Sequence, residues 1–285
     1  MDQVPSFYRR RLGQTLITTL SDGCLAGTTD IIEGLPAARK TEIMRACFRD
    51  QAPLPIPVNG FLAARGGRLA LIDTGAGATA PTAGRLKARL RAAGHGPEDI
   101  DTVLLTHLHP DHIMGLLHAD GRPAFPTARI LVHAADHRYW HDDAARAACP
   151  EPFRGFFDMA RQVCAAYAGR LETHAGGEVF PGIAAVPLPG HTPGHCGYQI
   201  ADEETLLLWG DIFHIVELQL RHPAATVAFD VDPAQAARTR EMTLARVAEE
   251  RLLVGGMHLG FPGFAHVGRE AGGYVLVPEL WRDTL

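Results

Sequence analysis

The residues best suited to chemistry form an HxHxDH motif that runs from His107 to His112. In an extended chain His107 and His109 point the same way, because side chains two residues apart share a face. Asp111 and His112 follow a proline, where the chain can turn into a helix and direct both toward a neighbouring position. This one segment can therefore supply two ligands to each of two adjacent metal ions.

Three distant segments offer complements to this motif, each preceded by glycine or by a glycine-rich turn. His191 lies in Pro-Gly-His-Thr-Pro-Gly-His, Asp211 follows Trp-Gly, and His258 follows Gly-Gly-Met. Imidazole and carboxylate groups suit Zn²⁺ and similar divalent ions, and a carboxylate can bridge two cations. We expect two divalent ions, Zn²⁺ above all. The predicted ligands are His107, His109, Asp111, His112, His191, Asp211 and His258.

A pair of such ions would perform hydrolysis without a nucleophilic side chain. Two divalent ions roughly 3.5–4 Å apart lower the pKa of a water between them from about 15.7 towards 7, which yields hydroxide at neutral pH. Asp111 could also carry a proton to the leaving group, and His214 could orient the substrate or share the proton transfer. We interpret Asp73 as a residue that holds a ligating imidazole in its tautomer.

The ligands must be positioned by strand ends. Short apolar strands end near Thr106, Leu188, Trp209 and Val254, and each is followed by the predicted His or Asp ligands. Loops beyond strand ends are where rigid scaffolds commonly hold functional residues. The pattern predicts a β-sandwich with all ligands at one rim.

Other segments give weaker but consistent signals. We expect a strand at 15–20 closed by a turn at 21–23, a hairpin of strands 58–64 and 69–73 turned at Gly66-Gly67, and an amphipathic helix at 84–93. A further helix is expected at 136–148, and Asp232-Pro233 should open another that runs to about Glu250. Without repeats or a linker, residues 1–285 are expected to form one domain, with an N-terminal arm at 1–14.

Composition narrows the class of protein. The 285 residues are 46% hydrophobic and 21% charged with a formal net charge of −5, and basic residues are scattered apart from Arg9-Arg10-Arg11. We therefore expect no nucleic-acid partner. No stretch reaches the roughly 18 apolar residues of a membrane span. Residues 1–14 resemble no signal peptide, so we expect no membrane partner and a cytoplasmic location.

Histidine is unusually frequent, whereas cysteine gives no motif. The chain has 15 His and 5 Cys, and no cysteines form a CxxC pair. We interpret the cysteines as reduced, and His195 and His266 as loop-bracing residues. His137 and His141 share a helical face close to His133, which leaves a third metal ion there as an alternative, but we interpret these histidines as structural.

The order of these motifs resembles the metallo-β-lactamase superfamily, and Asp73-Thr74-Gly75 matches its early DTG turn. The resemblance implies an α/β fold, a four-layer αββα sandwich. It also implies a first metal site of His107, His109 and His191, a second of Asp111, His112 and His258, and Asp211 as the bridge.

A narrower resemblance is carried by the C-terminal third. The segment 256–267, together with Asn-Gly-Phe-Leu at 59–62, is similar to the methyl parathion hydrolase branch and its lactonase and arylesterase relatives. Acyl-homoserine lactonases usually have tyrosine three residues beyond the bridging aspartate, where this chain has His214. The resemblance implies a hydrolase of lactones, aryl esters or phosphotriesters, with a small-molecule substrate and, by analogy, a homodimer.

Such substrates need an apolar pocket, and we expect about one in three of the available aromatic residues to line it. These residues are Phe125, Tyr139, Trp140, Phe153, Phe156, Phe157, Phe213, Phe261 and Phe264.

Two other functions remain open. A thioester hydrolase resembling glyoxalase II would need a basic patch for glutathione, which the sequence does not indicate. A mononuclear iron persulfide dioxygenase would not need the complete second ligand set of Asp111, His112 and His258.

Overall fold

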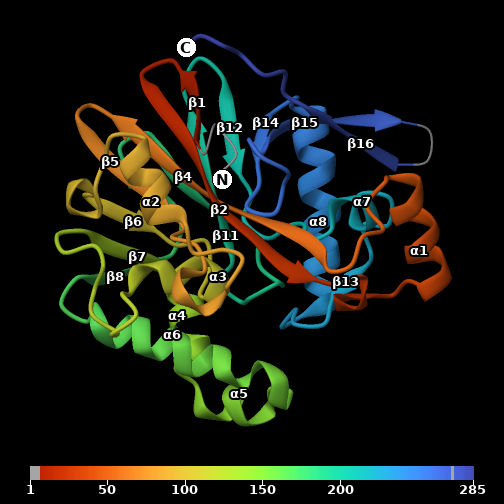
Figure 1. The fold of residues 1–285 in the computed structure, drawn as a ribbon, viewed down its shortest axis with the longest axis horizontal. Coiled ribbons are helices and arrows are strands. Elements are labelled where there is room, and N and C mark those ends of the chain that lie inside the picture. The colour runs from red at the N-terminus through yellow and green to blue at the C-terminus, as the bar shows by residue number, and fades with distance from the viewer. Residues whose placement is uncertain (1–6, 271–272) are drawn as a thin grey trace.

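The computed structural model describes residues 7–270 and 273–285 and consists mainly of two seven-stranded sheets (Figure 1). The first sheet has the order β1-β2-β4-β5-β6-β7-β8, and the second has the order β16-β15-β14-β12-β11-β10-β9. The strands of the first sheet are β1 (Phe7–Leu12), β2 (Thr15–Gly27), β4 (Leu54–Arg65), β5 (Arg68–Ile72), β6 (Thr102–Leu104), β7 (Arg129–His133) and β8 (Leu171–His174). Those of the second are β9 (Gly177–Phe180), β10 (Ile183–Pro187), β11 (Cys196–Ala201), β12 (Thr205–Leu208), β14 (Leu253–Gly255), β15 (Phe264–Glu270) and β16 (Gly273–Pro278).

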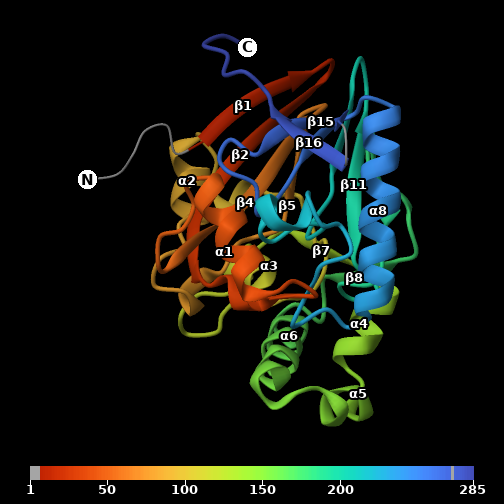
Figure 2. The same cartoon turned by 90° about the vertical axis from the view of Figure 1, so that its right-hand side faces the viewer.

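Helices cover the outer face of each sheet, and Figure 2 shows α8 and α2 on opposite sides with strands between them. A small pair of strands, β3 (Ile32–Glu33) and β13 (Thr226–Val227), packs beside α1 and α7. The helices are α1 (Ala37–Ala46), α2 (Leu86–Ala92), α3 (Pro110–Ile113), α4 (Ala134–Trp140), α5 (Asp143–Ala148), α6 (Arg154–Ala166), α7 (Val216–Gln219) and α8 (Pro233–Glu249).

Alternating side chains on the strands create three stacked apolar layers. In β12, Leu206 and Leu208 belong to the cluster between the sheets, while Leu207 packs in the cluster under α8. In β5, Ile72 faces the same central layer and Leu71 faces the helices of the first sheet. A strand buried on both faces has a nearly continuous run of apolar residues, as these two strands have after their first residue. The predicted αββα sandwich is confirmed.

The strand directions bring the ligand-bearing loops to one rim. Strand β11 is antiparallel to both β10 and β12, and β12 is parallel to β14. Strands β10, β12 and β14 therefore run the same way, and their carboxyl ends precede His191, Asp211 and His258. The first sheet is joined to this rim by the backbone hydrogen bond from Cys196 N to Thr106 O, at 3.0 Å.

Several local predictions are confirmed. The hairpin of β4 and β5 turns at Gly66 and Gly67, whose φ angles of 57° and 75° suit a tight turn that favours glycine. Asp232 caps α8 by accepting a hydrogen bond from Gln235 N at 2.9 Å. The segment predicted as an N-terminal arm differs, because its residues Phe7–Leu12 form β1 and pair with β2 in the first sheet.

Two local predictions are wrong. The turn expected at 21–23 is a β-bulge, and β2 continues to Gly27. The Asp22 carboxylate accepts hydrogen bonds there from three backbone amides of the 76–86 segment. The helix expected at 136–148 is split into α4 and α5, because Asp142 accepts hydrogen bonds from Ala144 N and Ala145 N and so caps a new helix.

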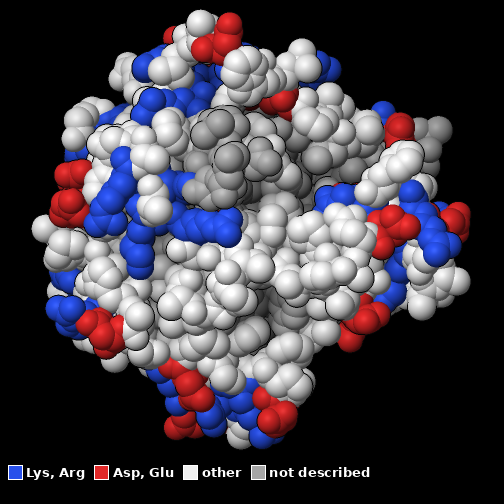
Figure 3. Space-filling model, viewed as in Figure 1, with Lys and Arg blue, Asp and Glu red and all other residues white. Residues whose placement is uncertain are grey.

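The face seen in Figure 3 has a largely uncharged centre, with acidic and basic side chains around its edges and one basic group on its left half. Positive charge therefore does not extend across the centre of this face. No helix in the described parts of the chain is both long and apolar enough to cross a membrane.

Arg240 on α8 stabilises the chain segment that follows β12 and Asp211. Its buried guanidinium donates hydrogen bonds to the carbonyl oxygens of Ile212, Pro223 and Ala225, each at 2.7 Å. We predict that Arg240→Met lowers the free energy of unfolding by roughly 2–4 kcal/mol, because it leaves buried carbonyls unpaired. Urea denaturation measures this change. Arg238→Met, at an exposed position of α8, serves as the control, and equal stability of both variants would contradict the prediction.

Candidate metal centre

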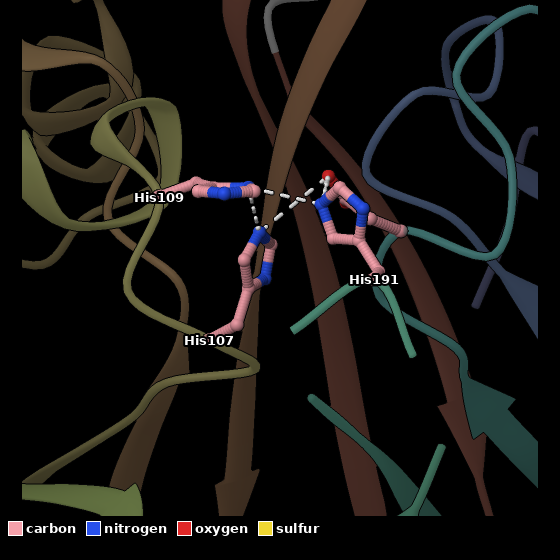
Figure 4. Close-up of side chains that lie close together, drawn as sticks. His107, His109 and His191 are labelled. Carbon is pink, nitrogen blue, oxygen red and sulfur yellow. Dashed lines mark hydrogen bonds and ion pairs between the residues drawn. The ribbon is translucent and has the colours of Figure 1, made fainter. Parts of the chain in front are cut away.

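Three histidines from two loops face one another at the rim of the sandwich (Figure 4). His107 and His109 come from the loop after β6, and His191 comes from the loop after β10. His109 Nδ1 lies 3.0 Å from His107 Nε2 and 2.9 Å from His191 Nε2. All three side chains are buried, and burial lowers the pKa of His107 and of His109 well below the ordinary value. Neutral imidazoles in this arrangement can direct their lone pairs at one cation.

A second group lies next to the first. It comprises Asp111, His112 and His258, whose ligand atoms lie within 4.8 Å of one another. Asp111 Oδ2 is 3.5 Å from both His112 Nε2 and His258 Nε2. Asp111 and His112 come from α3, which Pro110 opens as the sequence predicts. The second group stays in contact with the first, because the rings of His112 and His107 have centroids 4.2 Å apart.

Asp211 lies between the two groups. Its Oδ2 atom is 3.7 Å from His107 Nε2 and 3.6 Å from His191 Nε2 in the first group. The same oxygen is 3.2 Å from His112 Nε2 and from His258 Nε2 in the second. One carboxylate oxygen thus faces imidazole nitrogens of both groups. The structure therefore brings together all seven residues that the sequence predicts as ligands.

The cluster has the polar atoms that cations would satisfy. His112 Nε2 and Asp211 Oδ1 are buried without a hydrogen-bond partner among the residues that the structure describes. Burial alone would lower the pKa of His112, but the carboxylates of Asp211, Asp111 and Asp73 raise it well above its ordinary value. Buried carboxylates in such number need positive charge near them. These donor types and unpaired atoms fit divalent ions.

Carboxylates and a hydroxyl behind the imidazoles fix their orientations. His112 Nδ1 donates to Asp73 Oδ2 at 2.7 Å, which confirms the role expected of Asp73. His107 Nδ1 donates to Thr106 Oγ1 at 3.0 Å, and that hydroxyl donates to Asp73 Oδ2 at 2.8 Å. These bonds place the ring protons on Nδ1 and leave Nε2 free to face the cluster.

Two further orienting contacts were missed by the sequence analysis. His191 Nδ1 donates to Asp230 Oδ1 at 2.7 Å, and His258 Nδ1 donates to the carbonyl oxygen of Pro57 at 2.7 Å. Burial opposes ionisation of Asp230, but the hydrogen bond from His191 lowers its pKa below the ordinary value. In the sequence, the only signal for this contact was the acidic side chain of Asp230 just before Asp232-Pro233. Its position alone does not indicate which residue it bonds to.

Asp136 and His195 brace the loops that carry the ligands. The buried Asp136 carboxylate accepts hydrogen bonds from Leu108 N at 2.8 Å and Gly194 N at 3.1 Å, so it ties two ligand loops together. His195 Nδ1 donates to Leu188 O at 2.7 Å, and its Nε2 accepts from Asp211 N at 2.9 Å. Its predicted bracing role is confirmed, and so is that of His266, which bonds to Leu252 O.

His214 contacts the centre from the second sheet's side. Its Nε2 lies 3.1 Å from Asp211 Oδ2, and its ring stacks on His258 with centroids 5.1 Å apart. Burial lowers the pKa of His214 to about 4, so the ring is neutral near pH 7. Both ring nitrogens lack a hydrogen-bond partner in the described chain, which leaves them free for a substrate or an ion.

Cavities open on two sides of the centre. One, of about 320 Å³, includes His109 and Asp230 and is otherwise mainly apolar; the other, of about 200 Å³, includes His214, His258 and the ion pair of Arg49 with Glu217. The sequence analysis expected about one in three of the nine aromatic residues to line a pocket, and more than that line the first cavity. Phe229 also lines it, and the sequence analysis missed this residue. The expected ones that line it are Tyr139, Trp140, Phe153, Phe156 and Phe157.

Comparison with known proteins agrees with this architecture. The Metallo-beta-lactamase superfamily model matches residues 53–258. Among solved structures, the hydrolase AbOPH of the β-lactamase superfamily shares 32% identity with a TM-score of 0.93, over 99% of this chain and 100% of that one. The dizinc quorum-quenching lactonase AidC, in complex with its product, shares 25% identity with a TM-score of 0.91, again over 99% and 100%.

Two curated relatives match over shorter segments. The uncharacterized protein YobT of Bacillus subtilis (strain 168) is 30% identical over 165 residues, which are 57% of this chain and 65% of YobT. An N-acyl homoserine lactonase of Bacillus sp is 29% identical over 117 residues, 41% of this chain and 39% of the lactonase. The chain thus spans less than two thirds of either curated relative.

The family match covers most of the chain, and the similarity to AbOPH and AidC extends over nearly all of it. The chain belongs to the metallo-β-lactamase superfamily and is a hydrolase of that superfamily.

Proposed function

We propose that this protein is a dinuclear metal-dependent hydrolase of lactones, aryl esters or phosphotriesters. The observation that carries the proposal is the position of Asp211 Oδ2, which lies within 3.7 Å of imidazole nitrogens in both ligand groups. The first ion would be held by His107, His109 and His191, and the second by Asp111, His112 and His258, with Asp211 shared. Zn²⁺ is the proposed metal, because it accepts both nitrogen and carboxylate ligands.

When bound, two such ions lower the pKa of water and polarise a carbonyl or phosphoryl oxygen. The residues around them would complete the reaction. The Asp111 side chain is 18% exposed, unlike the nearly buried Asp211, so it can reach a leaving group and transfer a proton to it. The neutral His214 would position the substrate from the opposite side by accepting or donating a hydrogen bond.

The apolar cavity supports a substrate with an acyl chain or aryl group. Phe229 contacts the rings of His109 and His191, with centroids 5.8 Å and 5.7 Å apart, so the aromatic wall reaches the centre itself. A product bearing a hexanoyl chain is bound by AidC, whose fold this chain shares. An apolar group next to the metal ligands would gain from burial against Phe153 and Phe156.

The lining of this cavity does not favour a thioester of glutathione. Its described lining residues include no Lys or Arg, and the Arg49 guanidinium of the second cavity pairs with Glu217 at 2.7 Å. A tripeptide with two carboxylates would need unpaired cationic partners there.

The cytoplasmic location and the homodimer expected from the sequence stay predictions.

An activity panel tests the proposed substrates. The zinc-reconstituted protein is expected to hydrolyse at least one of N-acyl homoserine lactones, simple γ- and δ-lactones, aryl esters or paraoxon-type phosphotriesters. A strong chelator should abolish the activity, and added Zn²⁺ should restore it, because no side chain replaces the metals. Inert behaviour toward every substrate, together with turnover of a glutathione thioester, would refute the proposal. So would full activity of the metal-free protein.

Matched histidine variants separate ligand from catalytic roles. His258→Ala is expected to reduce bound zinc by about one ion per chain and to lower kcat at least about 10²-fold, since it removes a ligand. His214→Ala should keep both ions and lower kcat alone. His118→Ala, at an exposed position outside the cluster, is the control. Elemental analysis with steady-state kinetics measures both effects, and unchanged metal content in His258→Ala would contradict the assignment.

The aromatic wall is tested by shortening one ring. Phe153 packs against Phe156 and Phe229, with ring centroids 5.8 Å and 5.9 Å apart. We expect Phe153→Ala to raise KM for long-chain acyl or aryl substrates roughly 5- to 30-fold, because about 1–2 kcal/mol of apolar burial is lost. Short-chain lactones should be nearly unaffected. Phe48→Ala is the control, since Phe48 is 91% exposed, and the same KM for both variants would argue against this pocket.

A further inference from the structure

A second type of ligand cluster lies outside the centre, where α4 and α6 pack side by side. It consists of His137 and His141 on α4 or at its end and Cys164 on α6. Their ligand atoms all lie within 4.8 Å of one another. The sequence analysis interpreted the two histidines as structural, and the structure adds Cys164 to them from another helix.

The two histidines are arranged for joint binding. They are four residues apart on one helical face, and their rings stack with centroids 4.2 Å apart and planes 24° apart. His141 Nδ1 donates to the carbonyl oxygen of His137 at 2.8 Å. This bond leaves His141 Nε2 deprotonated and available in the neutral ring. A histidine pair at this spacing is a common metal-binding arrangement on helices.

Cys164 supplies a different ligand type from the opposite helix. Its side chain is buried at the base of a cleft of about 600 Å³, which His137, His141 and Arg161 also line. The thiol is free of any disulfide. The Arg161 guanidinium is engaged by Asp143 at 2.8 Å and by the Trp140 carbonyl oxygen at 2.9 Å, so its charge is partly neutralised.

We propose that His137, His141 and Cys164 form a third metal site, which binds one Zn²⁺ with a fourth position open to the cleft. At tetrahedral angles, Zn–N and Zn–S bonds of about 2.1 and 2.3 Å place ligand atoms roughly 3.4–3.6 Å apart. The three ligand atoms lie within 4.8 Å of one another, so side-chain rotations that bring them roughly 1 Å closer would complete the site. Two imidazoles and a thiolate are the soft and borderline ligands that zinc prefers over calcium or magnesium.

Binding at this site exchanges a proton for the ion. Burial raises the pKa of the Cys164 thiol to about 12, so the sulfur is protonated near pH 7 without a cation. When Zn²⁺ binds, the S–H bond breaks, the electron pair forms the Zn–S bond, and the proton passes to solvent. No oxidant or reductant is needed.

The ion would join two helices that shape the proposed substrate pocket. Trp140 of α4 and Phe157 of α6 line that pocket, with ring centroids 4.6 Å apart. Asp136 of α4 also holds both Leu108 N and Gly194 N beside the ligand loops. A link between His137 and Cys164 would therefore stiffen the pocket wall without contributing to the reaction.

Cobalt titration of the full chain tests the site, with Co²⁺ as the spectroscopic substitute for Zn²⁺. The predicted catalytic centre contains no sulfur, so a thiolate-to-Co²⁺ charge-transfer band in the near ultraviolet would come only from a cysteine site. We expect this band in the native protein with about three Co²⁺ per chain. Cys164→Ser should lose the band and one ion, and His141→Ala, at an exposed position, should lose or greatly weaken it.

Cys47→Ser is the matched control, because Cys47 lies at the end of α1, outside the cluster, and this variant should keep the band. Absence of the band from the native protein at saturating Co²⁺ would overturn the proposal, as would its persistence in Cys164→Ser. Failure of the dinuclear proposal would not remove this signal, because none of the three residues is shared with the seven predicted ligands.

Discussion

The structure depends on the burial of carboxylates and imidazoles together at one rim of the sandwich. Asp73, Asp211 and His112 are almost completely buried, and charge in such a place is costly unless opposite charge and hydrogen bonds surround it. The contacts of Asp211 Oδ2 with imidazoles of both groups provide part of that compensation. The cations that these donors fit would provide the rest, so the geometry of the rim is set by charge balance as much as by packing.

The rim is held by a frame of carboxylates that lie behind the predicted ligands. Asp73 bonds to Thr106 and His112, Asp136 joins the loops of both sheets, and Asp230 fixes His191. Each of these carboxylates lies behind a ligand and bonds to a backbone amide or an imidazole. The frame thereby fixes ring orientations before any ion binds, which reduces the reorganisation that binding would otherwise require.

The sequence predicted the parts of the centre that depend on local order, and missed those that depend on distant packing. HxHxDH and the strand-end positions of Asp211 and His258 follow from periodicity and turn chemistry, and so does the capped helix at Asp232. The partner of Asp230 could not be predicted, because a single acidic residue has no periodicity. The helix predicted over 136–148 was also wrong, because the Asp142 side chain accepts two backbone hydrogen bonds and so caps a new helix.

Substrate selection and chemistry reside in different parts of this fold. Strand ends of both sheets supply the predicted ligands, whereas α4, α5, α6 and the segment around Phe229 supply the apolar cavity. His109 belongs to both, because its ring also packs against Trp140 and Phe156 with centroids 5.3 Å and 5.4 Å apart. Most wall residues contact no other predicted ligand. The wall can therefore change shape with little effect on the centre, except through the side chains that contact His109 or, like Phe229 and Asp230, His191.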